Sequence, residues 1–385
     1  MRSRTLLLLA LVTLSGGSGC GGSNGADGSN EGASVFTTPD AQTQSESRPA
    51  QCSGALPTRF VDGVPASMAS PEGTTAPRDV SDLYVDEVVT DSGLLYWTLL
   101  AGQDGRIVTA SIGQGAPAIV VDETGEGAPT HLAVEGGRLV WLEASASDAS
   151  LARVMRVATD GWDPRALTGF EPIIDVAYDA SAAYVVEGSS IVRVALETGA
   201  RQLVASVPGA FIGRIAVDDV NVSFVTWSAG QSVVTLARAP KTGGSVTAVA
   251  AQSTSTSAAP MGDVATSGAE VFWSLAGAPP RVLATPDDGG VSATLATTEG
   301  TATMLRPRGA WLYFTSWDVP TPSLFRLPVQ GGTPSLAAPL VATADAPIPG
   351  YAGTASRGAI ALDATNVYFG GFDAANAPAV FCVAQ

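Results

Sequence analysis

The chain has 385 residues, 45% of them hydrophobic, which is enough for a large core and for one to three domains. Charged residues are sparse at 15%, whereas glycine (43) and proline (25) are abundant, a mixture typical of short strands joined by tight turns. Lysine and arginine total 20 against 36 aspartates and glutamates. The resulting net charge of −16 repels phosphate backbones and therefore excludes nucleic acid as an expected partner.

Residues 1–19 have the pattern of an export signal. Arg2 and Arg4 precede an apolar segment, residues 6–14, that is too short to span a bilayer, and small residues follow up to Cys20. The end of this segment, Ser18, Gly19 and Cys20, resembles a bacterial lipoprotein signal, in which the cysteine after the cleavage site is lipidated. Gly17 stands where that family usually has leucine, so cleavage by a general signal peptidase stays open.

The lipoprotein resemblance implies a palmitate-type anchor on Cys20 and a place in the cell envelope. The anchored protein would sit at the outer membrane or on the periplasmic side of a membrane, and plain secretion is the alternative. Residues 20–50 are rich in Gly, Ser and Asn and poor in large apolar side chains, which predicts a disordered tether with a span of about 30 Å. Residues 51–385 are then expected to form one repeat domain.

An aromatic doublet recurs along this domain. It ends at Trp97, Trp141, Trp273, Phe314 and Phe369, with weaker copies ending at Val185 and Phe224. The intervals between these seven markers are 44, 44, 39, 49, 41 and 55 residues. A β-rich unit with this period predicts an all-β fold, a seven-bladed β-propeller of four-stranded antiparallel blades. Six and eight blades are the alternatives, because the longest interval contains a Pro/Gly-rich segment, residues 342–356, that we interpret as a loop.

Positions counted back from the marker keep their chemistry. The ninth residue before it is a large aliphatic in every copy, as a buried inner strand requires. The eighth is mostly alanine, which lets inner strands converge on a central axis, with Val89 and Arg306 as exceptions. The sixth is most often Asp, which favours a turn because its side chain bonds nearby backbone N–H groups. Glycines 14 to 20 residues after the markers predict tight hairpins.

The seventh repeat ends at Gln385, one strand short. We expect residues 52–61 to supply that strand and close the ring, which removes an exposed edge. With Cys20 lipidated, Cys52 and Cys382 remain, one in the donor strand and one in the last strand. In an oxidising compartment this predicts a Cys52–Cys382 disulfide bond, with two free buried thiols as the alternative.

The doublets resemble the YWTD-type propeller repeat of low-density-lipoprotein-receptor-like proteins and their bacterial relatives. The best match is residues 92–112, which contain Leu95, Tyr96, Trp97 and Thr98. The resemblance covers most of residues 82–385 and implies a propeller. The Asp that ends the family motif is absent from every copy, and receptor-type rings have six blades, so neither its inter-blade bond nor receptor-like ligand binding is carried over.

The sequence contains little catalytic chemistry. There is one histidine, His131, and no GxSxG turn, calcium loop, phosphate loop or dinucleotide fingerprint, so we expect no metal and no cofactor. One set of residues could form a site. The tenth residue before the marker, at the start of each inner strand, is ionisable in five repeats: Glu87, His131, Asp175, Arg214 and Asp263. Inner strands surround the axis, so these groups should meet at one mouth of the channel, either as a ligand site or as a solvated rim of ion pairs.

The sequence therefore predicts an exported, membrane-tethered propeller that acts as a binding or scaffold module for an envelope protein, a peptide or a carbohydrate. The alternative is an enzyme on a propeller, such as a lyase or glycosidase, with Glu87, Asp175 and Asp263 as its carboxylates. A purely structural envelope component is the third possibility.

Overall fold

The computed structural model describes residues 52, 58–62, 83–101, 104–112, 116–123, 127–254, 261–316, 323–339, 360–372 and 378–385, all of which belong to the unit Arg48–Gln385. The predicted signal (residues 1–19), the lipidation site Cys20, the tether (residues 20–50) and the Pro/Gly-rich loop (residues 342–356) lie outside the described residues. Among the described residues, no helix is long and apolar enough to cross a membrane.

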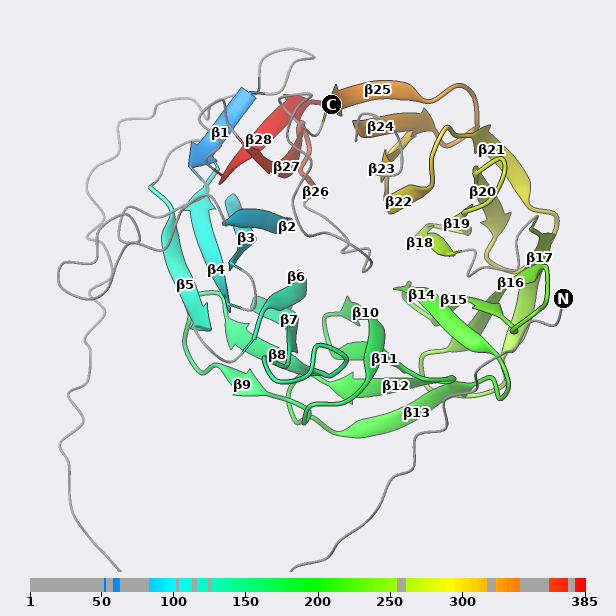
Figure 1. Cartoon of the computed structure of the whole chain (residues 1–385), viewed down its shortest axis with the longest axis horizontal. Helices are drawn as coiled ribbons and strands as arrows, with labels where there is room; N and C mark the ends of the chain where they lie inside the picture. The colour runs from blue at the N-terminus through cyan, green and yellow to red at the C-terminus, as the bar shows by residue number, and fades with distance from the viewer. Residues whose placement is uncertain are drawn as a thin grey trace, which may run out of the picture. The chain divides into compact units, whose positions relative to one another are not determined.

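The described secondary structure consists of strands, arranged as seven four-stranded antiparallel sheets around a common centre (Figure 1). Each sheet is one blade, so the predicted all-β, seven-bladed propeller is confirmed. In each blade the strands follow one another in sequence from the centre outwards, and the seventh blade is the one exception.

The first three blades lie between residues 84 and 206. Blade 1 contains β2 (Tyr84–Asp91), β3 (Leu94–Ala101), β4 (Asp104–Ser111) and β5 (Ala118–Glu123). Blade 2 contains β6 (Pro129–Glu135), β7 (Arg138–Ala144), β8 (Ala152–Ala158) and β9 (Arg165–Ala166). Blade 3 contains β10 (Ile173–Asp179), β11 (Ala182–Glu187), β12 (Ser190–Ala195) and β13 (Arg201–Ser206).

The remaining blades complete the ring. Blade 4 contains β14 (Phe211–Val217), β15 (Asn221–Trp227), β16 (Val233–Pro240) and β17 (Thr247–Ser253). Blade 5 contains β18 (Met261–Ser267), β19 (Glu270–Leu275), β20 (Arg281–Pro286) and β21 (Ala293–Thr297). Blade 6 contains β22 (Ala302–Arg308), β23 (Trp311–Ser316), β24 (Ser323–Pro328) and β25 (Ser335–Pro339). Blade 7 contains β26 (Ile360–Leu362), β27 (Asn366–Phe372), β28 (Pro378–Ala384) and, from the other end of the chain, β1 (Thr58–Asp62).

Blade 7 is closed by an N-terminal strand, as predicted, but that strand is Thr58–Asp62, and Cys52 lies before it and not in it. β1 pairs antiparallel with β28, and Thr58 lies opposite Cys382. The predicted Cys52–Cys382 disulfide bond is present, with the two Cα atoms 5.8 Å apart. Cys52 and Cys382 are buried in the apolar layer between blades 7 and 1, together with Trp97.

The core consists of seven apolar layers, one at each blade junction. The aromatic doublets explain how the layers are filled, because successive side chains of a strand point to opposite faces. Trp97 packs towards blade 7, whereas Tyr96 packs towards blade 2. Phe314 and Tyr313 repeat the arrangement towards blades 5 and 7. A doublet of two aromatic residues thus gives one large side chain to each neighbouring blade.

The turns after the inner strands follow the predicted chemistry. The Asp363 carboxylate accepts hydrogen bonds from the backbone N–H groups of Thr365 and Asn366, both at 2.7 Å, and Asp179 and Asp218 form equivalent turns. The Tyr368 hydroxyl donates to the second oxygen of Asp363 at 2.6 Å, which ties the doublet to the turn. Glycines are predicted in the hairpins between the third and fourth strands, and five of them lie in the part of the chain that the structure describes. Their φ values are between 71° and 101° (Gly161, Gly199, Gly243, Gly289 and Gly331). Gly115, the glycine predicted for blade 1, lies outside the described residues.

Candidate functional site: the central channel

The inner strands of blades 1–6 share an irregularity near their start. In all six, the pairing of the inner strand with the second strand shifts register at or next to the tenth residue before the marker. His131 and Met304, which occupy that position, have positive φ values of 55° and 57°. A β-bulge re-aims the side chain of the residue that it contains. The bulges therefore turn side chains at the tenth position towards a neighbouring blade and not only towards the channel mouth.

Three carboxylates at this position, Glu87, Asp175 and Asp263, bind the backbone of the following blade; we call them the junction carboxylates. Their hydrogen bonds come from Leu132 N to Glu87 Oε2, from Ile215 N to Asp175 Oδ2 at 2.8 Å, and from Leu305 N to Asp263 Oδ2 at 2.9 Å. All three residues are at most 4% exposed. They bridge blades 1 and 2, 3 and 4, and 5 and 6. Each bond comes from the tenth residue before the marker, and not from the end of the doublet motif, where this chain has no Asp.

Asp175 is at the centre of an ion-pair cluster that joins three blades. His131 Nε2 of blade 2 lies 3.4 Å from Asp175 Oδ1, and Arg214 Nη1 of blade 4 donates to the same oxygen at 3.0 Å. The His131 and Arg214 side chains are each 14% exposed, against 1% for Asp175. Three of the five predicted site residues therefore meet, while Asp263 binds blade 6 and Glu87 binds blade 2.

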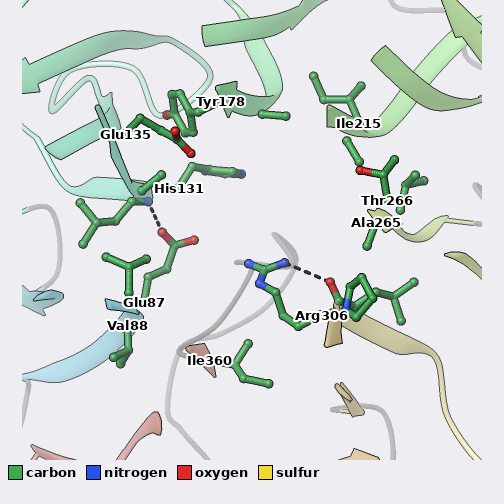
Figure 2. Close-up of a pocket in the computed structure, with 18 residues that line it drawn as sticks. Glu87, Val88, His131, Glu135, Tyr178, Ile215, Ala265, Thr266, Arg306 and Ile360 are labelled. Carbon is green, nitrogen blue, oxygen red and sulfur yellow. Dashed lines mark hydrogen bonds between the residues drawn. The ribbon is translucent and has the colours of Figure 1, made fainter. Parts of the chain in front are cut away.

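A cavity of about 380 Å³ lies between the inner strands (Figure 2). Aliphatic residues at the eighth and ninth positions before the marker form most of its wall, among them Val88, Leu132, Ile215, Val264 and Leu305. Of the five predicted site residues, Glu87 and His131 line this cavity. Asp175, Arg214 and Asp263 are not among the described residues that line it.

Polar lining residues that the sequence prediction did not include are Glu135, Tyr178, Thr266 and Arg306. Arg306 occupies the eighth position before the marker, where five of the seven blades have alanine. This departure from the repeat was the feature of the sequence that could have identified Arg306 as a cavity residue. Glu135 occupies the sixth position, where the repeat pattern predicts a turn residue. In Figure 2 the guanidinium of Arg306 extends into the cavity from one side, and Glu135 and Tyr178 lie on the other. Arg306 Nη1 also donates to Leu305 O at 3.2 Å.

Burial governs the carboxyl of Glu135. It raises the pKa of Glu135, nearby Asp179 raises it further, and Lys241 opposes both. In the neighbouring turn, burial raises the pKa of Asp179, but hydrogen bonds from Lys241, Ser181 and Tyr184 outweigh it, so the pKa lies below its ordinary value. Lys241 Nζ is 2.5 Å from Asp179 Oδ2. The Lys241 ammonium group is thus paired with the Asp179 carboxylate. Glu135 has no such short ion pair with Lys241, and its partly buried carboxyl lines the cavity.

The arrangement has the features of a binding site: an apolar wall with a few charged and polar groups. In the part of the chain that the structure describes, no three His, Cys, Asp or Glu side chains gather as a metal site would require. The carboxylates proposed for an enzyme do not converge in the cavity, because Asp175 and Asp263 are buried between blades.

No protein-family model matches the chain, and no curated protein matches it. Solved structures share its fold at low identity. The oligogalacturonate lyase of Vibrio parahaemolyticus aligns with a TM-score of 0.54 and 10% identity over 85% of this chain and 96% of that chain. The β-propeller domain of the trilobed protease from Pyrococcus furiosus aligns with a TM-score of 0.53 and 10% identity over 78% and 95%. That domain is described as having an open velcro topology, whereas β1 closes the last blade here.

A nidogen chain from a nidogen/laminin complex aligns over 64% of this chain and 76% of its own, with 14% identity and a TM-score of 0.37. That similarity is too low to carry a family assignment. The oligogalacturonate lyase and the protease domain, both with TM-scores above 0.5, share the β-propeller fold with this chain, and the YWTD-type resemblance stays a prediction.

Proposed function

We propose that this protein is an exported, membrane-tethered binding module that holds a small ligand reversibly in the central channel. The observation that carries the proposal is the cavity of about 380 Å³, a size within the range of small-molecule sites, with an apolar wall and convergent polar groups. The inner strands that form it are held in place by the junction carboxylates and by seven packed layers. A rigid wall of this kind lowers the entropy lost on binding.

The residues divide the work. The aliphatic wall would bury the apolar part of the ligand, which provides most of the affinity. Glu135, Tyr178 and Arg306 would orient its polar groups inside the cavity. Glu87 and His131 lie near the start of the inner strands β2 and β6 and would interact with polar groups of the ligand at that end of the channel. The enzyme alternative receives no support from this geometry, because Asp175 and Asp263 do not line the cavity together with Glu87.

The location of the module follows from the sequence alone. Cys20 would carry the lipid, residues 20–50 would act as the tether, and the propeller would stand clear of the membrane on the periplasmic side. Mass spectrometry of the mature N-terminus tests this part. An acylated Cys20 is expected, together with loss of membrane association in the Cys20→Ser variant. A mature N-terminus at another residue, without acyl groups, would leave secretion as the explanation.

Thermal-shift screening against sugars, peptides and cations tests the binding proposal. A ligand at one hundred times its Kd stabilises a protein by about 2.7 kcal/mol, which a shift in Tm detects. Hits should bind to wild type and lose binding in Ala265→Leu, because Ala265 lines the cavity. Ala293→Leu is the matched control, since Ala293 is exposed on the outer strand β21. A hit that is indifferent to Ala265→Leu would place binding outside the channel. Recovery of one envelope protein with both variants would favour the scaffold interpretation.

A further inference from the structure

Polar side chains join the inner strands of neighbouring blades. The junction carboxylates join blade 1 to 2, 3 to 4 and 5 to 6. Between blades 4 and 5, Thr266 Oγ1 donates to Val217 O at 3.1 Å. Blade 7 is joined on both sides through Leu362 O, which accepts from Arg308 Nη1 of blade 6 at 2.8 Å and from Thr90 Oγ1 of blade 1 at 3.5 Å. At six of the seven junctions, a carboxylate, hydroxyl or guanidinium group thus binds the backbone of the neighbouring blade.

The junction between blades 2 and 3 has a link of a different kind, because one of its partners is a histidine. His131 Nε2 of β6 lies 3.4 Å from Asp175 Oδ1 of β10. Carboxyl groups ordinarily titrate near pH 4 and guanidinium groups above about pH 12, whereas an imidazole changes its charge between about pH 5 and 8. His131 is the one histidine in the sequence, so no other junction is joined by an imidazole.

The imidazole of His131 is held in one orientation in both of its charge states. Its Nδ1 lies 3.2 Å from Thr130 Oγ1, and a hydroxyl can donate to a neutral ring nitrogen or accept from a protonated one. On the other side of the ring, Nε2 faces Asp175. The backbone is fixed as well, because the N–H of the next residue, Leu132, donates to Glu87 in blade 1 (Figure 2). Protonation therefore changes the charge of the link without turning the side chain.

Titratable and charged groups surround His131 on several strands. Those on the strands around it and across the cavity are Asp86 and Glu87 of β2, Glu135 of β6, Glu143 of β7, Asp175 and Tyr178 of β10, Arg214 of β14 and Arg306 of β22. Glu143 is paired with Arg153 at 2.6 Å, and Glu135 and Arg306 have opposite charges. Asp86 adds a buried negative charge. Apart from Glu87, Asp175 and Arg214, these groups therefore add a net negative charge around the imidazole.

Glu87, Asp175 and Arg214 share the tenth position with His131 and decide its charge. Two carboxylates and one guanidinium sum to −1, and an imidazolium at His131 brings the sum to zero. Burial by itself opposes a charged imidazole, yet without that charge the buried group of four keeps an uncompensated negative charge. Asp175 is 1% exposed and His131 14%, so water screens the attraction little. The folded ring therefore stabilises the imidazolium form, and the attraction between β6 and β10 weakens when the proton leaves.

We propose that His131 is a pH-sensitive link in the channel wall: its imidazolium form holds blades 2 and 3 together at their inner strands, and loss of the proton loosens that junction. His131 lines the cavity, so the change acts on the wall of the binding site itself. Because the folded state favours the protonated form, the link stabilises the ring fully below the ordinary histidine value of about 6.5, and this contribution is lost as the proton leaves at higher pH.

Nuclear magnetic resonance on the full chain without added histidines follows the titration directly, since one histidine gives one Cε1–H signal. We expect Asp175→Asn to lower the midpoint of that titration by about one pH unit or more, because the variant removes the neighbouring charge. Arg214→Gln removes the opposing cation and should raise the midpoint, and it takes the place of Asp175→Asn if that variant does not unfold cooperatively. Asp288→Asn, in an exposed turn, is the control and should leave the midpoint unchanged.

Urea denaturation between about pH 5.5 and 8 measures the effect on the ring. Wild type should be more stable than His131→Gln at the acidic end, and the difference should shrink as the pH rises. Met304→Leu is the matched control, because Met304 has the same position in blade 6 and a φ of 57° against 55° for His131. Its difference from wild type should be the same at every pH. Glu135→Gln and Glu187→Gln remove carboxyls whose pKa burial raises, and both should keep the wild-type pH profile.

The outcomes separate this link from the proposed function, because none of the measurements needs a ligand. An unchanged midpoint in both Asp175→Asn and Arg214→Gln overturns the inference, and so does a stability difference between wild type and His131→Gln that is constant with pH. A pH profile that survives in His131→Gln but disappears in Glu135→Gln or Glu187→Gln assigns the response to a carboxyl and also overturns it. Failure of every compound in the thermal-shift screen would contradict channel binding and leave the pH-sensitive link standing on these results.

Discussion

Asp175 shows how one side chain can connect three blades. Its carboxylate accepts the N–H of Ile215 from blade 4, and His131 Nε2 and Arg214 Nη1 lie 3.4 Å and 3.0 Å from its other oxygen. A buried carboxylate of this kind contributes little net stability as a pair, but its removal leaves the two partners uncompensated.

We therefore expect Asp175→Ala to lower the free energy of unfolding by about 3 kcal/mol, because it leaves the Arg214 charge and the Ile215 N–H without their acceptor. Asp175→Asn retains one acceptor oxygen and should cost about half as much. Urea denaturation measures both. Asp288→Ala, in an exposed turn, is the control and should stay within about 0.5 kcal/mol of wild type. Equal stability of Asp175→Ala and the control would show that the cluster does not hold the blades.

Asp363 predicts a dependence on acid. Burial raises the pKa of Asp363, but hydrogen bonds from Tyr368, Thr365 and Asn366 outweigh it, and the pKa lies below its ordinary value. A carboxyl whose folded pKa is lowered stabilises the protein fully above its unfolded pKa of about 3.9, and this contribution is lost as the pH falls through the folded pKa. Asp363→Asn should therefore cost about 1 kcal/mol at pH 7, after allowance for partial exposure, and should lose less stability than wild type below about pH 4. Urea midpoints from pH 7 to pH 3 measure the difference, and parallel pH profiles would contradict it.

At the level of the strand, the repeating positions could be predicted from the sequence, but the bulges in the inner strands could not. The markers, the aliphatic ninth position and the turn aspartates could be predicted because each repeats with the blade and depends on local alternation. The bulges could not, because they depend on how an inner strand pairs with its neighbour, and Glu87, His131 and Met304 share no residue type. The sequence gives the tenth residues the same position in each repeat, but it does not predict the direction of their side chains. Asp263 was expected at a channel mouth, yet it lies buried between β18 and β22.

The hydrogen bond across that junction can be tested at the level of the element. In Asp263→Ala the Leu305 N–H loses its acceptor and β18 loses a bond to β22. We expect the Leu305 amide to exchange with solvent at least tenfold faster, since a hydrogen bond to a charged group contributes about 1.5–3 kcal/mol. Amides at the junction between blades 3 and 4 provide the internal reference. Faster exchange throughout the ring would indicate global destabilisation instead of opening at one junction.

Two interactions in blade 7 close the ring: the pairing of β1 with β28 and the Cys52–Cys382 disulfide bond. The bond links residues 330 positions apart, so it restricts the unfolded chain strongly. The double variant Cys52→Ser, Cys382→Ser should lose about 2–5 kcal/mol of unfolding free energy. Chemical denaturation measures the loss, with the wild type under reducing conditions as a second comparison. The variant should keep the fold, because six of the seven apolar layers contain neither cysteine. A variant as stable as wild type would assign closure to β1 alone.

Antiparallel pairing of Thr58 with Cys382 places the beginning of the first strand beside the end of the last one. A short hairpin joining them would give blade 7 the same uninterrupted connectivity as the other six. The order of the blades along the chain would then not be needed to close the ring. A circular permutant that starts at a different blade, with the end of β28 joined to the start of β1, should form the same propeller.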